Sequence, residues 1–359
     1  MPEPLKNIYT RSFIAELCEA LEISYPKFDS QGFADGVFDE AWEGKELKAR
    51  MGHIAEILHR FLPMGYRESL DILMAASPGF GGFEAMFFPD FVERYGLSEF
   101  EDSMEALELF TKVSSSEFAV RAFIKRDPQR MMAQMEVWAD SKNEDVRRLA
   151  TEGCRPRLPW AMALPDFKTD PLPVLEILEK LKEDESEYVR RSVANNLNDI
   201  SKDHPELVIR VALSWLGKSS ETDWVVKHAC RTLLKQGDPD ALALFGFGSP
   251  GHIEIEDLIV DESVAWGDSL TFSFRLQTPK KRLGKLRIEY GIDFMKNNGR
   301  QSRTIFKISE SDFPSQEKQV ARSHAFKPIS TRKYYAGAHG IAIILNGQEV
   351  ASGAFELVM

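Results

Sequence analysis

Three acidic side chains lie in or beside helices that otherwise carry repeated basic residues. They are Glu117, Glu152 and Asp199, and Glu152 follows Arg148 by four residues, on the same helical face. A carboxylate among arginines weakens the binding of a polyanion, so an acid that faces such a ligand needs a compensating task. Stabilising positive charge in a ligand or transition state is one such task, as in glycosidic cleavage. For each acid alone, capping or ion pairing is the alternative.

The segment from Glu144 to Trp160, EDVRRLATEGCRPRLPW, begins as a helix and then breaks its own pattern. A helix cannot run through its two prolines without a kink or an end. The broken part carries, in order, Arg155, Pro156, Arg157, Pro159 and Trp160. The Trp160 ring offers a cation–π contact to an electron-poor ring. We therefore expect this segment to be functional.

A repeat positions these residues, and its marker is an Asp-Pro helix start, because Asp caps the helix and Pro fits its first turn. The starts are Asp127-Pro128, Asp170-Pro171, Asp203-His204-Pro205 and Asp238-Pro239, whose prolines step by 43, 34 and 34 residues. A period in the thirties with two helices per unit predicts a helical solenoid of the HEAT type. The surplus of the long step lies between Gly153 and Asp170, so the broken segment is an insertion, which in solenoids projects from one face.

Basic residues recur at equivalent places in the repeats NEDVRRLATEGCRP, SEYVRRSVANNLND and TDWVVKHACRTLLK. They are Arg147, Arg148, Arg190, Arg191, Lys227 and Arg231, to which the insertion adds Arg155 and Arg157. Equivalent positions line one face of a solenoid, so the pattern predicts a positive groove that binds phosphates. Solvated helix charges are the alternative.

After Leu244 a Gly/Pro-rich hinge, FGFGSPG, precedes segments that alternate apolar and polar residues between turns such as Asn298-Gly299. Six to eight short strands predict an antiparallel sandwich of immunoglobulin type without the usual disulfide. The fold class is thus multidomain α plus β: a HEAT-like α-solenoid over 1–246, followed by an immunoglobulin-like β-sandwich over 247–359. Two turns are unusually basic: one carries Lys280, Lys281 and Arg282, and the other carries Lys296 and Arg300. A short basic loop of this kind can grip the backbone of a polyanion.

The formal net charge of −11 over 359 residues argues against non-specific coating of nucleic acid. The first 117 residues alone carry a balance of −12, so the rest is nearly neutral and permits a local polyanion site. Three scattered cysteines give neither a disulfide framework nor a metal spacing. The N-terminus has no signal region, and no window approaches the length of a membrane span. We expect a cytoplasmic monomer with no membrane contact, metal or cofactor.

The segments SSEFAVRAFIKRDP, VRRLATEGCRPRLPWAMALP and VRRSVANNLNDISKDHP resemble the AlkC branch of the AlkC/AlkD-like DNA glycosylases, a family of HEAT-like-repeat alkylation-repair enzymes. The most specific part is Ala150–Trp160, ATEGCRPRLPW, in which Thr151 stands where Ser is common in the family. The resemblance covers the whole helical part. An appended immunoglobulin-like domain is known in part of this branch, so the predicted sandwich fits as well.

The resemblance implies base excision repair: excision of cationic N3-alkylated bases, 3-methyladenine and 3-methylcytosine, from double-stranded DNA, without base flipping. Glu117, Glu152 and Asp199 match the family's acidic positions facing the lesion. Trp160 matches their aromatic neighbour, and Arg148 matches the basic position near the lesion backbone.

The competing class is a non-enzymatic HEAT-repeat adaptor that binds a protein partner. Its support is the net charge of −11 and the frequent use of helical arrays in protein binding. An adaptor should show no salt-sensitive affinity for DNA, whereas an enzyme that clamps phosphates should lose binding steeply as salt rises.

Overall fold

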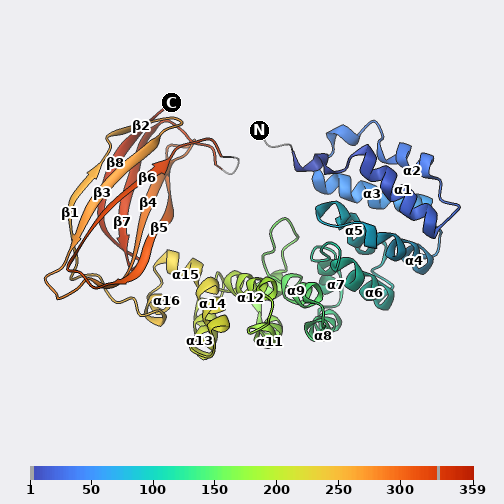
Figure 1. Cartoon of the computed structure of the whole chain (residues 1–359), viewed down its shortest axis with the longest axis horizontal. Coiled ribbons are helices and arrows are strands. Elements are labelled where there is room, and N and C mark those ends of the chain that lie inside the picture. Colours follow the sequence, from blue (N-terminus) through green and yellow to red (C-terminus); the bar gives the residue numbers. More distant parts are fainter. Residues whose placement is uncertain (1–3, 330–331) are drawn as a thin grey trace. The chain divides into compact units, whose positions relative to one another are not determined.

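A computed structural model describes residues 4–329 and 332–359, and in this part of the chain helices precede strands (Figure 1). The first helices are α1 (Arg11–Ser24), α2 (Ser30–Val37), α3 (Leu47–Phe61), α4 (Tyr66–Ala76), α5 (Phe87–Tyr95) and α6 (Phe100–Thr111). Short 3-10 turns η1 (Leu5–Ile8), η2 (Trp42–Gly44), η3 (Ser77–Gly79) and η4 (Phe83–Met86) lie among them. In α1, Thr10 caps the first turn and Ile14, Leu17 and Leu21 are buried at helical spacing.

The repeat region continues with a second set of helices. They are α7 (Val120–Arg126), α8 (Pro128–Ala139), α9 (Glu144–Glu152), α10 (Pro165–Thr169), α11 (Leu172–Leu181), α12 (Glu187–Ile200), α13 (Pro205–Trp215), α14 (Ser220–Ala229), α15 (Arg231–Gln236) and α16 (Pro239–Leu244). At α8 and α16 the Asp-Pro start acts as expected: Asp127 accepts from the Arg130 amide at 3.1 Å, and Asp238 from the Ala241 amide at 2.9 Å.

The repeats stack through two layers of helices. Helix α9 packs against α12 and α12 against α14, while α8 and α11 pack together in the second layer (Figure 1). The aligned segments NEDVRRLATEGCRP, SEYVRRSVANNLND and TDWVVKHACRTLLK thus form successive helices of one layer. Between α9 and α10 the chain leaves the stack as a loop, the green projection in Figure 1. The HEAT-like α-solenoid is therefore confirmed, and its insertion projects.

Two antiparallel sheets form the C-terminal sandwich, with one parallel edge pair, β2 with β8. The strands are β1 (Glu254–Val260), β2 (Ser263–Ala265), β3 (Ser269–Gln277), β4 (Gly284–Met295), β5 (Gln301–Phe313), β6 (Glu317–Ala325), β7 (Gly337–Leu345) and β8 (Gln348–Val358). Their orders are β1-β3-β6 and β2-β8-β7-β4-β5. Alternate residues such as Leu270, Phe272 and Phe274 of β3 are buried in the core between the sheets. The immunoglobulin-like expectation is confirmed.

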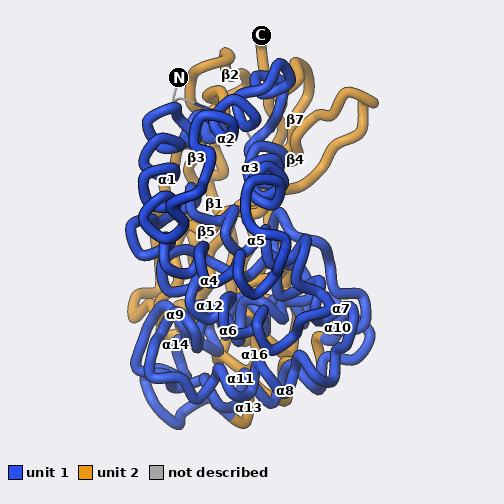
Figure 2. The backbone as a smooth tube through the Cα atoms, turned by 90° about the vertical axis from the view of Figure 1, so that its right-hand side faces the viewer, with its two compact units in different colours: residues 1–204, 215–229 blue, residues 205–214, 230–359 orange. Residues whose placement is uncertain are grey.

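The Gly/Pro-rich stretch after α16 packs against its surroundings. Phe247 is buried with Leu233 and Leu242 of the helices before it, and the Asn346 side chain donates to the Gly248 carbonyl at 2.7 Å. Consistent with this, the chain divides into two compact units (Figure 2). Unit 1 takes the residues up to 204 with 215–229, and unit 2 takes 205–214 with 230–359. The last helices thus pack with the sandwich, although the sequence changes period only at about 247.

Candidate active site

Arg155, in the insertion, links two of the three acids. Its Nη1 donates to Glu152 Oε1 at 2.6 Å, and its Nε donates to Asp199 Oδ2 at 2.9 Å. All three residues are buried, with whole-residue exposed fractions of 7% for Arg155, 5% for Glu152 and 2% for Asp199. A buried charge needs partners. The helices α9 and α12 supply the two acids, and the insertion supplies the cation between them.

Arg148 links the third acid to the same group. Its Nη1 donates to the Glu117 carboxylate and, at 3.0 Å, to Ser115 Oγ, while its Nη2 lies 3.5 Å from Glu152 Oε1. The five side chains therefore form one network, defined here as the acid network, in the order Glu117, Arg148, Glu152, Arg155 and Asp199. Lys202 Nζ, which lies 3.0 Å from Asp199 Oδ1, pairs with the last of these acids, so three carboxylates are matched by three cations.

The acids hold the two guanidiniums in their charged form. Burial by itself would lower the pKa of Arg155, but the nearby charges of Glu152 and Asp199 outweigh it, so this pKa is raised. The pKa of Arg148 is raised in the same way against its burial, by Glu152 and Glu117. The arginines thus stay cationic, and the network is ion-paired throughout.

Hydroxyl groups complete the hydrogen bonding of the Glu152 carboxylate. Ser192 Oγ donates to Glu152 Oε2 at 2.6 Å, and Thr151 Oγ1 donates to Ser192 Oγ at 2.6 Å. A threonine in place of the serine common in the family therefore keeps the hydroxyl in use. Every carboxylate oxygen of Glu152 accepts a hydrogen bond, so its orientation is fixed before any ligand arrives.

A cavity of about 300 Å³ opens beside Glu117. Its wall consists of Gly82, Phe83, Met86, Val113, Ser114, Ser115, Glu117, Arg148 and Tyr188. The Trp160 ring lies 6.0 Å from that of Phe83, centroid to centroid, and is 62% exposed. The backbone of Trp160 is left-handed, with a φ of 64°, which a non-glycine residue adopts only when its surroundings hold it there. The structure thus brings Trp160 next to the cavity of the acid network.

Four residues of the cavity wall or in contact with the acid network were not predicted from the sequence. They are Ser115, Ser192, Tyr188 and Phe83. Tyr188 lies 5.0 Å below the Arg148 guanidinium, a cation–π contact. The signal for two of them was present in the repeat, because Tyr188 and Ser192 are spaced by four on the helix aligned with that of Glu152. Phe83 had no local signal, since it comes from a distant turn.

The repeated arginine pairs divide in two. Arg147 donates to Asp184 at 2.6 and 2.9 Å and to two backbone carbonyls, and Arg190 donates to the carbonyls of Asp184 and Glu185. Arg147 therefore connects its own turn to the Asp184 turn of the next repeat, whereas Arg190 binds its own turn, and neither joins the acid network. Arg191 is exposed and pairs with Glu187.

The remaining basic candidates are scattered. Arg157 pairs with Asp203 at 2.6 Å. Lys227 belongs to α14 in unit 1, whereas Arg231 begins α15 in unit 2. Of the predicted cations, the structure thus brings only Arg148 and Arg155 into the acid network.

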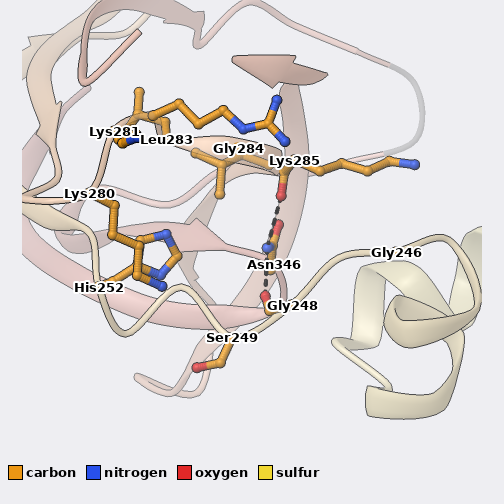
Figure 3. Close-up of a pocket in the computed structure, with 12 residues that line it drawn as sticks. Gly246, Gly248, Ser249, His252, Lys280, Lys281, Leu283, Gly284, Lys285 and Asn346 are labelled. Carbon is orange, nitrogen blue, oxygen red and sulfur yellow. Dashed lines mark hydrogen bonds between the residues drawn. The ribbon is translucent and has the colours of Figure 1, made fainter. Parts of the chain in front are cut away.

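The basic turn of the sandwich lines an open cavity of about 350 Å³. Lys280, Lys281 and Arg282 share it with His252 and Lys285 (Figure 3). Its walls come from the turn before β4, the first residues of β4, the turn between β7 and β8 and the stretch after α16, all in unit 2. The second turn, with Lys296 and Arg300, is exposed and closed by a backbone hydrogen bond of 2.9 Å between these two residues.

Among residues 4–329 and 332–359, no helix is long and apolar enough to cross a membrane. Within the same ranges, no group of three or more His, Cys, Asp or Glu side chains is arranged to hold a metal ion.

Comparison with known proteins gives two family matches and two close relatives. Residues 111–233 match a model described as DNA alkylation repair enzyme, and residues 254–359 match the C-terminal Ig-like domain of the uncharacterised protein YhaZ. YhaZ of Bacillus subtilis strain 168 is 47% identical over 355 residues, 98% of this chain and 99% of YhaZ. The alkylpurine DNA glycosylase AlkC of Pseudomonas fluorescens, solved on DNA with an abasic-site analogue, is 36% identical, with a TM-score of 0.95 over 99% of this chain and 100% of that one.

The family match and the AlkC relative show an N-glycosylase of DNA alkylation repair, which decides against the adaptor class. More closely, the chain belongs to the AlkC branch of the AlkC/AlkD-like HEAT-repeat DNA glycosylases, with an appended immunoglobulin-like domain.

Proposed function

We propose that this chain hydrolyses the N-glycosidic bond of cationic N3-alkylated bases, 3-methyladenine and 3-methylcytosine, in duplex DNA, without flipping the base. The observation that carries the proposal is the acid network, three acids from α9, α12 and the residues before α7. One of them, Glu117, lines a cavity together with Phe83, whose ring lies 6.0 Å from that of the exposed Trp160. Family membership supports the reaction type, because its AlkC relative is an alkylpurine DNA glycosylase.

The chemistry suits a cluster of three carboxylates. The methylated base is a cationic leaving group, so the electron pair of the breaking bond to C1′ neutralises it, and positive charge develops on the deoxyribose. Water then adds to C1′ and loses a proton. Carboxylates that lie near the sugar stabilise this transition state more than the ground state, since the sugar is charged only in the former.

Each acid is assigned a part. Glu152, held by two arginines and Ser192, supplies fixed negative potential, and Asp199 shares that role through Arg155. Glu117 lines the cavity, and its side chain is 15% exposed, against 7% for Glu152 and 3% for Asp199. It is therefore the acid best placed to position the attacking water. The exposed Trp160 ring holds the sugar and lesion by contact with its face.

The DNA backbone is proposed to contact basic side chains outside the acid network. These are Arg157, Arg191, Lys227 and Arg231 of the helices and Lys280, Lys281, Arg282, Lys296 and Arg300 of the sandwich. Arg148 and Arg155 border the lesion. Arg147 and Arg190 contribute less, because their donors already bind the turns between repeats. The protein is expected to bind DNA as a monomer.

The test is release of free base from alkylated duplex DNA, measured by mass spectrometry. Free 3-methyladenine and 3-methylcytosine are expected, and their ratio gives the preference. A fluorescent base analogue beside the lesion reports flipping, because an unstacked neighbour brightens; we expect no such change. Absence of both free bases would contradict the proposed substrates, and brightening that accompanies binding would contradict the non-flipping mode.

A further inference from the structure

Arg121 of α7 holds both ends of the insertion from outside it. Its Nη1 donates to the carbonyls of Gly153 at 2.9 Å and Arg155 at 2.8 Å, where the insertion begins. Its Nε donates to the carbonyl of Met162 at 2.7 Å, where the insertion ends. The residue has no exposed surface. One buried guanidinium therefore fixes three backbone points on either side of Trp160.

Lys48 of α3 holds the tip. Its Nζ donates to the Trp160 carbonyl at 2.9 Å and lies 4.6 Å from the centre of the Phe118 ring. This contact spans 112 positions of sequence. Because the carbonyl belongs to the residue with the left-handed backbone, the lysine acts at the place where the segment is most strained.

The insertion has few internal backbone hydrogen bonds to hold its conformation. Its internal backbone hydrogen bonds include Ala161 N to Leu158 O at 3.3 Å and Leu164 N to Pro156 O at 3.2 Å. Two prolines supply no donors. Hydrogen bonds to backbone carbonyls from outside are thus the natural way to order this loop, and cationic donors make the stronger ones.

A buried arginine is energetically unfavourable if its only role is to fill space. Burying a cation costs several kcal/mol unless hydrogen bonds compensate, and Arg121 Nη2 has no hydrogen-bond partner among the described residues. Burial lowers the pKa of Arg121 to about 10, so the side chain stays charged at neutral pH. An apolar residue would fill the same volume at less cost. What the guanidinium provides is a fixed position for the carbonyls that it binds.

These carbonyls belong to the residues that build the site. The Arg155 backbone is held by Arg121, while the Arg155 side chain links Glu152 and Asp199. We propose that Arg121 and Lys48 are positioning residues: they clamp the insertion so that the Arg155 guanidinium and the Trp160 ring lie at the acid network. The inference rests on the proposed function and adds two residues that touch no reacting atom.

The first test uses Lys48, which is exposed and can be changed without disturbing the core. Lys48→Met should lower the single-turnover rate of 3-methyladenine excision about tenfold, since displacements near 1 Å at a reacting centre cost up to about 100-fold. Binding of abasic product DNA should change less than about twofold, because no phosphate contact is assigned to Lys48. Lys48→Arg, which keeps a donor, should recover most of the rate.

Lys6→Met is the matched control. Lys6 pairs with Glu46 at the start of α3, so this variant removes a lysine contact of the same helix region without touching the insertion. Its rate should equal that of the parent. Equal losses in Lys6→Met and Lys48→Met would overturn the proposal, because the effect would then belong to α3 and not to the clamp.

The second test asks whether Lys48 acts through Trp160. In a Trp160→Ala background the aromatic ring is absent, so adding Lys48→Met should lower the rate by much less than it does in the parent. An additive loss in the double variant would show that Lys48 does not work by placing Trp160.

The third test needs no activity, so it separates the clamp from the reaction. Trypsin cleaves after Arg157 only when the insertion is loose. Arg121→Met and Lys48→Met should both accelerate this cut, and Arg121→Lys should do so less than Arg121→Met. If the parent releases no alkylated base, the proposed function fails while this measurement still tests the clamp. If Arg121→Met does not fold, the Lys48 pair decides; an unchanged cutting rate there contradicts the inference.

Discussion

A carboxylate that is already ion-paired with two arginines still acts on a transition state if its own charge is not fully neutralised. Glu152 is such a group, because Arg148 lies at 3.5 Å and Arg155 is shared with Asp199. The charge of Arg155 is divided between Glu152 and Asp199, and the orientation of the Glu152 carboxylate is fixed by Ser192. Preorganisation of this kind is what makes electrostatic stabilisation effective.

Glu152→Gln should therefore lower the single-turnover excision rate on 3-methyladenine DNA roughly 100-fold, about 2.7 kcal/mol of barrier, because shape is kept and charge is lost. DNA binding should stay the same or tighten. Glu187→Gln, the same change in an exposed ion pair with Arg191, is the control and should leave the rate near that of the parent. A parental rate in folded Glu152→Gln would return Glu152 to a structural ion pair.

His324 makes the sandwich sensitive to acid. Its Nδ1 lies 2.9 Å from the Tyr290 hydroxyl, and burial, helped by the charge of Arg332, lowers the pKa of His324 to about 4. Between about pH 4 and the ordinary value of 6.5, the unfolded chain thus binds a proton that the folded chain does not. The stability that His324 contributes is complete above 6.5 and is lost as the pH falls through this window.

The expected outcome is a melting temperature that falls from pH 7 to pH 5 more in the parent than in His324→Gln, measured by thermal unfolding. Glu289, whose pKa is raised by burial, acts in the opposite direction. Subtracting the variant's pH profile from the parent's isolates the histidine. Parallel profiles for the two proteins would show that His324 is not the group responsible.

At the scale of the element, the repeat uses its paired arginines for two different purposes. Arg147→Ala should lower the melting temperature, because the Asp184 side chain, which is only 4% exposed, would lose its buried partner.

Arg191→Ala should leave stability unchanged but weaken binding to modified and unmodified DNA alike. It should also flatten the salt dependence of binding by about one charge. Reversed results for the two variants would contradict this division.

The loop between α9 and α10 depends on a close approach at its start. A Cβ on Gly153 would lie 2.6 Å from Val120 Cγ2 and 3.0 Å from both Met135 Cε and the Leu149 carbonyl oxygen, so these groups or the start of the loop would have to shift. Gly153→Ala should lower the excision rate by displacing Arg155, and should lower the melting temperature by a few degrees. A stable variant with the parental rate would show that the packing yields without moving the site.

Much of this architecture was predictable, and the limits have physical causes. The helix starts at Asp127 and Asp238, the extra length after Gly153 and the alternating strands are local patterns, so the sequence alone predicted the solenoid, its insertion and the sandwich. The role of Arg147 was not predictable, because repeat register fixes the helix face but not the partner of a long side chain. Arg121 was not predicted for a related reason. Its partners are backbone carbonyls, which every residue has, so the identities of the partner residues do not indicate the contact.

At the scale of the whole molecule, the sandwich packs against the last helices of the solenoid. Within unit 2, a Cβ on Gly347 would lie 2.5 Å from the Gly237 Cα and 2.9 Å from Leu242 Cδ1, so the turn between β7 and β8 lies directly against α15 and α16. Phe247 fills the core of these helices. Removing the strands therefore exposes apolar surface on the last helices, in addition to removing basic residues.

Deleting residues 250–359 should leave unit 1 folded but let proteases cut between 230 and 249, and excision should weaken. Replacing both Lys280 and Lys281 with alanine keeps the strands, so stability should not change, yet the salt dependence of DNA binding should flatten by about two charges. Lys327→Ala, which changes an exposed lysine just after β6, is the control. If only the deletion weakens repair, the sandwich acts by supporting α15 and α16. If the double alanine variant also weakens repair, Lys280 and Lys281 bind DNA. If neither variant weakens repair, the sandwich has no part in the reaction.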